Sequence, residues 1–190
     1  PPLQTPTKGI REANMPADNV HLFTPFKLRG VTMRNRVWIS PMCQYSVFNQ
    51  DGVATDWHLA HLGSRAVGGA GLVMAEATAV EGRGRISAED LGLWNDRQCE
   101  ALARVARFVA EHGATPAIQI AHAGRKAGVA GAIAPSPIPF SEQTPTPQEM
   151  SQADIEDVTR AFAGAAGRAH EAGVVAAGAV EPLGAAHPVV

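Results

Sequence analysis

Three consecutive segments decide the fold: AGLVMAEA at residues 70–77, NDRQCEALARVARFVAEHG at 95–113 and TPAIQIAHAG at 115–124. The first and third are apolar runs of strand length, which are typical of strands covered on both faces. The second has one apolar stripe at helical spacing, formed by Leu102, Val105, Ala106 and Val109. Gly113 follows it, where a helix commonly ends in a left-handed residue. This order predicts two parallel strands joined by a right-handed crossover.

The same alternation extends toward the amino terminus. Residues 21–40 contain short β-prone pieces broken at Gly30, and they predict a small hairpin followed by a strand at about 36–40. The segment DWHLAHLGSRAVGG, residues 56–69, predicts a helix with Asp56 as its N-cap.

It also extends toward the carboxyl terminus. SQAD, residues 151–154, is a capping-box pattern that opens a helix ending at Gly173. We expect this helix to turn one apolar face inward, made of Ile155, Val158, Phe162 and Ala169. The run VVAAGAV, residues 174–180, predicts a further strand.

Two architectures have this alternation, a doubly wound sheet and a (β/α)8 barrel. No G-x-G-x-x-G motif follows any of the strands, since EGRGRIS at residues 81–87 lacks the third glycine, and this favours the barrel. A whole barrel needs about 200–250 residues, and only about four strand-helix units can be counted. We therefore expect an α/β chain forming the N-terminal half of a TIM barrel at residues 21–173. Residues 1–20 are interpreted as a polar tail and 174–190 as an atypical or truncated end.

The overall composition limits the possible partners. The 190 residues carry a formal net charge of −2 and are 45% apolar, which gives no reason to expect nucleic acid or an anionic membrane surface. We find neither a long apolar segment nor a secretory signal, and the two cysteines, Cys43 and Cys99, are too few for a disulfide framework. We therefore predict a cytoplasmic protein without a membrane span.

Polar side chains follow the buried strands, where barrels place their active sites. They are Ser40, Cys43, Tyr45, Gln119 and His122. A thiol can donate a weak hydrogen bond to an electron-rich cofactor, a phenol can donate one to a carbonyl, and an amide suits a flat heterocycle. A lone cysteine can equally be a small apolar filler, so both interpretations of Cys43 stay open.

Other kinds of site find little support. These residues include no cluster of carboxylates, and no G-x-S-x-G motif marks a hydrolase serine. His58 and His61 are one helical turn apart without a carboxylate or thiol spaced to support a metal. We interpret them as lying on a helix surface or interface, and we predict no metal site.

Five segments, in this order and spacing, resemble the Old Yellow Enzyme family of flavin reductases. They are RNRVWISPMCQYS (34–46), DWHLAHLGSRAVGGAGLVMAEATAV (56–80), GRISAEDLGLW (84–94), IQIAHAGRKA (118–127) and TPQEMS (146–151). The cysteine and tyrosine of SPMCQY are similar to those of its thermophilic-like class. The resemblance implies an FMN-bearing barrel that takes hydride from NADPH or NADH. It implies transfer of this hydride to activated C=C bonds of small enone-type substrates, which makes the enzyme an ene-reductase.

The resemblance also implies a role for individual residues. Ser40, Pro41 and Met42 would line the isoalloxazine ring, and Cys43 would lie beside the flavin O4/N5 edge. Ala77 would contact the flavin through its backbone, and Gln119 would hydrogen-bond its pyrimidine portion. Tyr45 would help to hold the substrate.

The match ends near residue 173. The family's fourth strand ends in a His-x-x-His or His-x-x-Asn pair that holds the substrate carbonyl, and this chain has Val180 and Leu183 there. His187 is either a displaced ligand or a coincidence. The second half of the barrel, which supplies the flavin's arginine contacts and phosphate site, is not in this sequence.

Three hypotheses follow for this chain. It is an inactive or weakly flavin-binding half barrel, it dimerises into a flavin-binding or interaction module, or a second chain completes the enzyme.

Overall fold

The computed structural model describes residues 21–180, with side chains for 21–175. Its elements in chain order are η1 (His21–Phe23), β1 (Phe26–Leu28), β2 (Val31–Met33), β3 (Trp38–Ile39), α1 (Asp56–Val67), β4 (Leu72–Ala79), η2 (Gly82–Gly84), α2 (Asp96–Glu111), β5 (Thr115–Ala121), η3 (Gly124–Lys126), β6 (Ile133–Ala134), β7 (Gln148–Glu149), α3 (Gln152–Glu171) and β8 (Ala176–Val180). The predictions made for the 1–20 tail, Leu183 and His187 lie outside these residues.

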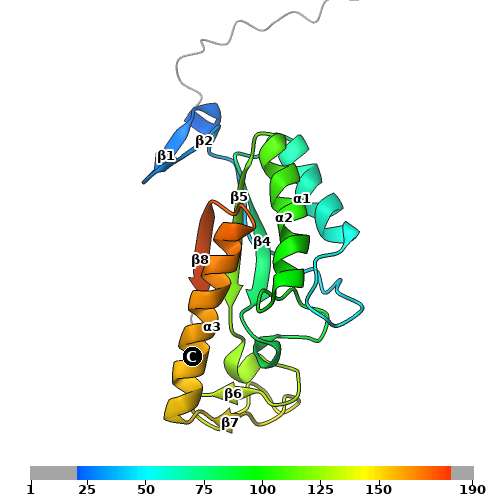
Figure 1. The fold of residues 1–190 in the computed structure, drawn as a ribbon, viewed down its shortest axis with the longest axis vertical. Coiled ribbons are helices and arrows are strands. Elements are labelled where there is room, and N and C mark those ends of the chain that lie inside the picture. The colour runs from blue at the N-terminus through cyan, green and yellow to red at the C-terminus, as the bar shows by residue number, and fades with distance from the viewer. Residues whose placement is uncertain (1–20, 181–190) are drawn as a thin grey trace, which may run out of the picture.

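A four-stranded parallel sheet in the order β3-β4-β5-β8 forms the centre of the fold (Figure 1). Each strand pairs with the one before it in the sheet order, and a helix connects each pair, as predicted from the alternating segments. The run at 174–180 does supply a strand, β8. The result is an α/β partial barrel.

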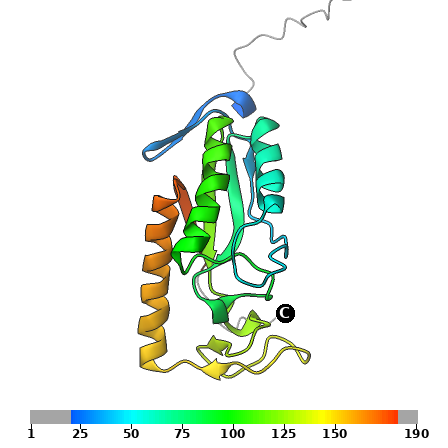
Figure 2. The same ribbon diagram turned by 45° about the vertical axis from the view of Figure 1, so that its right-hand side comes forward.

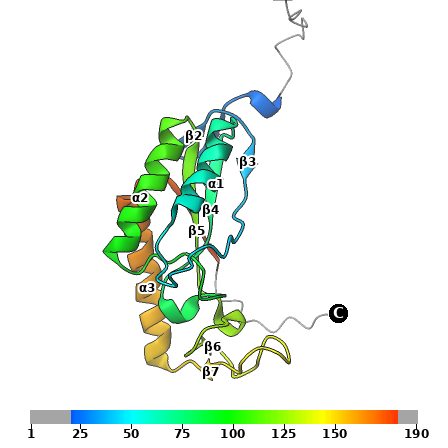
Figure 3. The ribbon, with the colours of Figure 1, turned by 90° about the vertical axis from the view of Figure 1, so that its right-hand side faces the viewer.

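The three helices cover one face of this sheet (Figures 1 and 3). One apolar cluster joins α1, α2 and α3 to the odd positions of early β4 and the even positions of β5, including Leu62, Leu102, Ala165, Val73 and Ile118. Within the described part of the chain, no helix lies on the opposite face (Figure 3). The sheet therefore has a helix side and an open side.

The two ends of the sheet differ. The β1–β2 hairpin, antiparallel as predicted, lies beyond the amino ends of the strands (Figure 2). Segments η3, β6 and β7 lie at the carboxyl ends (Figure 2). The loops that follow β4 and β5 therefore gather at one end of the sheet, as in a barrel.

Two predictions about the helices are corrected. The N-cap of α1 is Thr55 rather than Asp56, which is the first helical residue and places its carboxylate at the positive end of the helix dipole. Ile155 does not point into the core and is 47% exposed, whereas Val158 and Ala169 are buried. The physical reason is that the first turns of α3 extend beyond the carboxyl end of the sheet (Figure 1).

Strand β4 contains a β-bulge at Glu76. Its pairing with β5 runs regularly from Leu72 to Ala75 and resumes at Ala77, so Glu76 is an extra residue. Before the bulge, Val73 and Ala75 face the helices, whereas after it the odd-numbered Ala77 faces the open side of the sheet. The bulge thus reverses which residues of β4 point to each side.

Candidate active site

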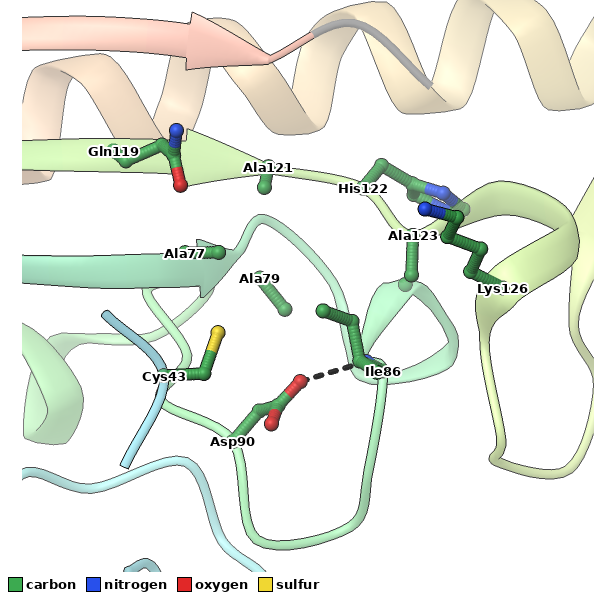
Figure 4. Close-up of a pocket in the computed structure, with 11 residues that line it drawn as sticks. Cys43, Ala77, Ala79, Ile86, Asp90, Gln119, Ala121, His122, Ala123 and Lys126 are labelled. Carbon is green, nitrogen blue, oxygen red and sulfur yellow. Dashed lines mark hydrogen bonds between the residues drawn. The ribbon is translucent and has the colours of Figure 1, made fainter. Parts of the chain in front are cut away.

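A cavity of about 260 Å³ lies at the carboxyl ends of β4 and β5, on the open side of the sheet. It is lined by Cys43, Ala77, Ala79, Gly84, Ile86, Asp90, Gln119, Ala121, His122, Ala123 and Lys126 (Figure 4). Three of these residues were predicted to contact one ligand, and they come from three successive strand ends. Cys43 follows β3, Ala77 belongs to β4 and Gln119 to β5.

The other residues predicted for this site lie on the segment after β3. Pro41 is half-buried, whereas Ser40, Met42 and Tyr45 are exposed and do not line the cavity. Tyr45 has a φ of 50°, which is uncommon for a bulky residue that is not glycine. The structure thus brings Cys43, Ala77 and Gln119 together, and it leaves the roles of all these residues as predictions.

Small side chains make one wall of the cavity flat and apolar. Because of the bulge, Ala77 and Ala79 of β4 lie beside Gln119 and Ala121 of β5 on the open side of the sheet. The Gln119 amide extends into this space (Figure 4). The arrangement suits a planar ring that needs an apolar face and an edge with hydrogen-bond donors and acceptors.

Asp90 is a buried carboxylate in the cavity that the sequence analysis missed. It accepts hydrogen bonds from the backbone N–H groups of Ile86 at 2.7 Å and Ser87 at 3.2 Å, and from the Ser87 hydroxyl at 3.1 Å (Figure 4). Burial raises the pKa of Asp90 despite these bonds. The serine three residues before the aspartate was the only local signal, and it is common in ordinary turns.

The Cys43 thiol lies near two carboxylates. Burial raises its pKa above the ordinary value, and the negative charges of Asp90 and Glu76 raise it further. Cys43 is therefore a neutral thiol near pH 7, able to donate a hydrogen bond, rather than a nucleophilic thiolate.

His122 borders the other side of the cavity and is fixed by two hydrogen bonds. Its Nδ1 accepts the Gly124 N–H at 3.0 Å, so its Nε2 carries the hydrogen that faces Glu81 Oε1 at 2.9 Å. Arg83 joins Glu81 to Asp154 in the first turn of α3. This network ties the loop after β4 to the start of α3.

His58 lies at an interface, one of the two positions expected for it, and not on the helix surface. Its side chain is 2% exposed and lies 3.3 Å from the buried Glu76, between α1 and β4. Helical spacing alone could not reveal this, since the partner lies in the next strand. His61, one turn further on, is partly exposed as expected.

The residues that the structure describes lack two features. They contain no group of three His, Cys, Asp or Glu side chains arranged to hold a metal ion. None of their helices is both long enough and apolar enough to cross a membrane.

Parallel strands, a helix on each crossover and a cavity at the carboxyl ends of the strands define a partial (β/α) barrel with its candidate ligand site at the end where barrel enzymes bind their ligands. The family model described as the NADH:flavin oxidoreductase / NADH oxidase family matches residues 21–179, and the chain belongs to this family. Members of the family use FMN with NADH or NADPH.

Individual relatives support the same family assignment. An NADPH dehydrogenase of Geobacillus sp. (strain WCH70) is 54% identical over 153 residues, which are 80% of this chain and 45% of the relative. The crystal structure of Old Yellow Enzyme from Pichia sp. AKU4542 superposes with a TM-score of 0.78 at 26% identity, covering 84% of this chain and 45% of that one. The structure of morphinone reductase in complex with tetrahydroNAD superposes with a TM-score of 0.75 at 26% identity, covering 85% of this chain and 49% of that one. The chain spans about half the length of the relatives it matches.

The lining residues fit the flavin ring of FMN. The alanine wall leaves room for a planar system, and the Gln119 amide offers both a donor and an acceptor to a pyrimidine edge. The neutral Cys43 thiol can face an electron-rich atom without repelling it. The cavity, at about 260 Å³, is slightly below the usual size range of ligand sites, about 300–1,000 Å³.

Proposed function

We propose that this chain carries the first half of the flavin site of an FMN-dependent ene-reductase. The enzyme would reduce the activated C=C bond of α,β-unsaturated carbonyl compounds with NADPH or NADH as hydride donor. The observation that carries the proposal is the convergence of Cys43, Ala77 and Gln119 on one cavity. These are the residues that the resemblance assigns to FMN, and they come from separate strands.

The proposed roles follow from the chemistry of each group. Gln119 would bind the pyrimidine edge, the backbone at Ala77 would contact the ring, and the segment of Ser40, Pro41 and Met42 would lie along it. Cys43 would donate its S–H toward the ring and tune its reduction potential. Bound FMN supplies the hydride-transfer chemistry.

Tyr45 is proposed to hold the substrate. Its phenol is exposed beside the Cys43 segment, and burial together with the nearby Cys43 raises its pKa, so it stays a hydrogen-bond donor at neutral pH. A phenol that donates to a carbonyl withdraws electron density from the conjugated alkene and makes it accept hydride more readily.

A second candidate function is an inactive half barrel that binds flavin or dimerises. It is favoured by Val180, which ends β8 where the resemblance requires a carbonyl-binding histidine. The open face of the sheet and its two edge strands, β3 and β8, favour pairing with a second copy in this form, whereas pairing with a carboxyl-terminal half would complete the enzyme of the first proposal. We propose a cytoplasmic location for either form.

One set of measurements separates these functions. The purified chain is mixed with FMN and examined by absorbance, flavin fluorescence and gel filtration. NADPH oxidation with cyclohexenone is then followed for the chain alone and with the carboxyl-terminal half of the Geobacillus relative. Flavin binding with activity only after complementation supports the first function. Flavin binding or a dimer without activity in either mixture supports the second. No flavin binding in either mixture refutes the first function, and the absence of both flavin binding and a dimer refutes the second.

A further inference from the structure

Glu76 and His58 form a buried pair that the proposed flavin contacts leave unused. The side chains are 3% and 2% exposed, and the Glu76 Oε1 atom lies 3.3 Å from His58 Nε2. The other oxygen, Oε2, accepts the backbone N–H of Gln44 at 2.9 Å. Gln44 lies between Cys43 and Tyr45, so the pair contacts the backbone that carries both proposed site residues.

The protonation state of His58 follows from its other contact. Its Nδ1 accepts the backbone N–H of Thr55 at 2.9 Å, so Nε2 carries the hydrogen in the neutral ring. This hydrogen faces the Glu76 carboxylate, although the contact falls short of hydrogen-bond geometry and His58 Nε2 has no hydrogen-bond partner among the described residues. The imidazole therefore presents a buried donor toward the carboxylate.

The β-bulge explains why a glutamate can lie here. A regular strand would place residue 76 on the open side of the sheet with Leu72 and Met74. As the extra residue, Glu76 instead reaches α1 and the segment after β3. Bulges that redirect a side chain are common beside active sites.

Residues 43–45, which Glu76 contacts, are strained and belong to no strand. Tyr45 has a left-handed φ, which is strained for a residue that is not glycine. Residue 44 has three further bonds: its side chain accepts the Trp57 indole N–H at 3.1 Å and donates to the Met42 carbonyl at 2.7 Å, and its own carbonyl accepts the Ser46 hydroxyl at 2.9 Å. Glu76 supplies the bond to the Gln44 N–H from a side chain that is itself buried.

We propose that Glu76, oriented by His58, is a positioning residue that fixes residues 43–45 and so sets where the Cys43 thiol lies in the cavity. The inference rests on the proposed function for its importance to catalysis. Its geometry can be tested on the chain without any flavin. A failure of flavin binding would therefore leave the test of positioning intact.

The first measurement uses the unmodified chain. Amide hydrogen exchange by NMR is expected to be at least about tenfold slower for Gln44 than for Phe48 of the neighbouring exposed turn, because only the former N–H is bonded to a buried carboxylate. Equal exchange at the two amides, after correction for intrinsic rates, would overturn the proposal without any substitution.

The second measurement is the pH dependence of Cys43 alkylation in a Cys99→Ser background. In Glu76→Gln an amide NH2 must face either Gln44 N–H or His58 Nε2–H, so one contact becomes a donor opposite a donor. Loss of the charge also lowers the pKa of the Cys43 thiol, to which Glu76 contributes. We expect a lower pH midpoint and alkylation about fivefold faster at pH 7.5.

Two more variants separate position from charge. His58→Gln leaves the Glu76 charge in place, so we expect the pH midpoint of Cys43 alkylation to stay the same. Because Glu76 loses the side chain that orients it, residues 43–45 should be held less firmly, and the limiting alkylation rate at high pH should rise. Glu100→Gln removes a charge from the exposed face of α2 and should change neither the pH midpoint nor the limiting rate of Cys43 alkylation. Circular dichroism establishes that each variant is folded, and an unfolded Glu76 variant leaves His58→Gln to decide. Profiles of folded Glu76→Gln or His58→Gln that match the Glu100 variant would refute the positioning role.

Discussion

Replacing Gly84 with alanine tests whether the His122 ring is fixed at the border of the cavity. A Cβ atom on residue 84 would lie 2.6 Å from His122 Cδ2 and 3.0 Å from its Cγ and Nε2, well inside van der Waals contact. The ring cannot rotate away freely, since it is bonded to Glu81 on one side and to the Gly124 N–H on the other. We expect Gly84→Ala to displace the ring and to break its bond to Glu81.

The magnitude follows from two opposing effects. A hydrogen bond to a charged partner contributes about 1.5–3 kcal/mol, and the partial exposure of Glu81 favours the lower end. Alanine also lowers the entropy of the unfolded chain, which returns about 0.4–1 kcal/mol. The free energy of unfolding should therefore fall by about 1 kcal/mol.

Gly30 provides the matched control, because a Cβ there would have no atom within 4 Å and its backbone is not left-handed. Gly30→Ala should be neutral or stabilising by up to about 1 kcal/mol. Urea unfolding followed by circular dichroism measures both variants, and the midpoint is compared at equal m-value. Equal stability of the two variants would show that His122 is free to move and would refute the reasoning.

The remaining predictions concern the core, the loop network and the cavity. Ile118→Ala, at a 0% exposed position of β5, should lower the free energy of unfolding by about 3–4 kcal/mol in the same assay, and a loss below about 1 would contradict the packing. Burial would raise the pKa of Glu81, yet hydrogen bonds from its partners lower it below the ordinary 4.5. Its stabilisation is therefore present above about pH 4.5 and lost as the pH falls through the folded pKa, so Glu81→Gln should flatten the stability profile between about pH 5 and 3, and an unchanged profile counts against the network. Gln119→Ala should weaken FMN binding about 10–100-fold in a fluorescence titration through the loss of one or two hydrogen bonds, whereas equal affinity would exclude the amide contact. Cys43→Ala, in the enzyme completed by its second half, should shift the flavin potential and spare the fold, and a spectroelectrochemical titration that finds no shift would refute its tuning role.

The layout of the sheet could be predicted from sequence because its signals are local. Apolar runs such as 70–77 and 115–121 are long enough to show burial on both faces, and Asn95 and Ser151 cap their helices with backbone bonds only three residues away. The convergence of Cys43 and Gln119 then follows from parallel strands, whose carboxyl ends meet at one edge.

The details that escaped depend on contacts between distant segments. The bulge at Glu76 is a mismatch between two strands, so neither strand shows it alone. His58 is buried because Glu76 lies across from it, and Ile155 is exposed because the sheet ends before the helix does. A period of 3.6 identifies the face of a helix without revealing how far its neighbour extends.

The bulge in β4 also gives the strand one residue that has no pairing partner in β5. Residue 76 belongs neither to the row that packs under the helices nor to the row that forms the alanine wall. A change at this position would therefore act first on the Gln44 N–H and the His58 ring, and through them on the segment that carries Cys43. A laboratory library confined to this position would sample the placement of the thiol segment while the rest of the architecture stays constant.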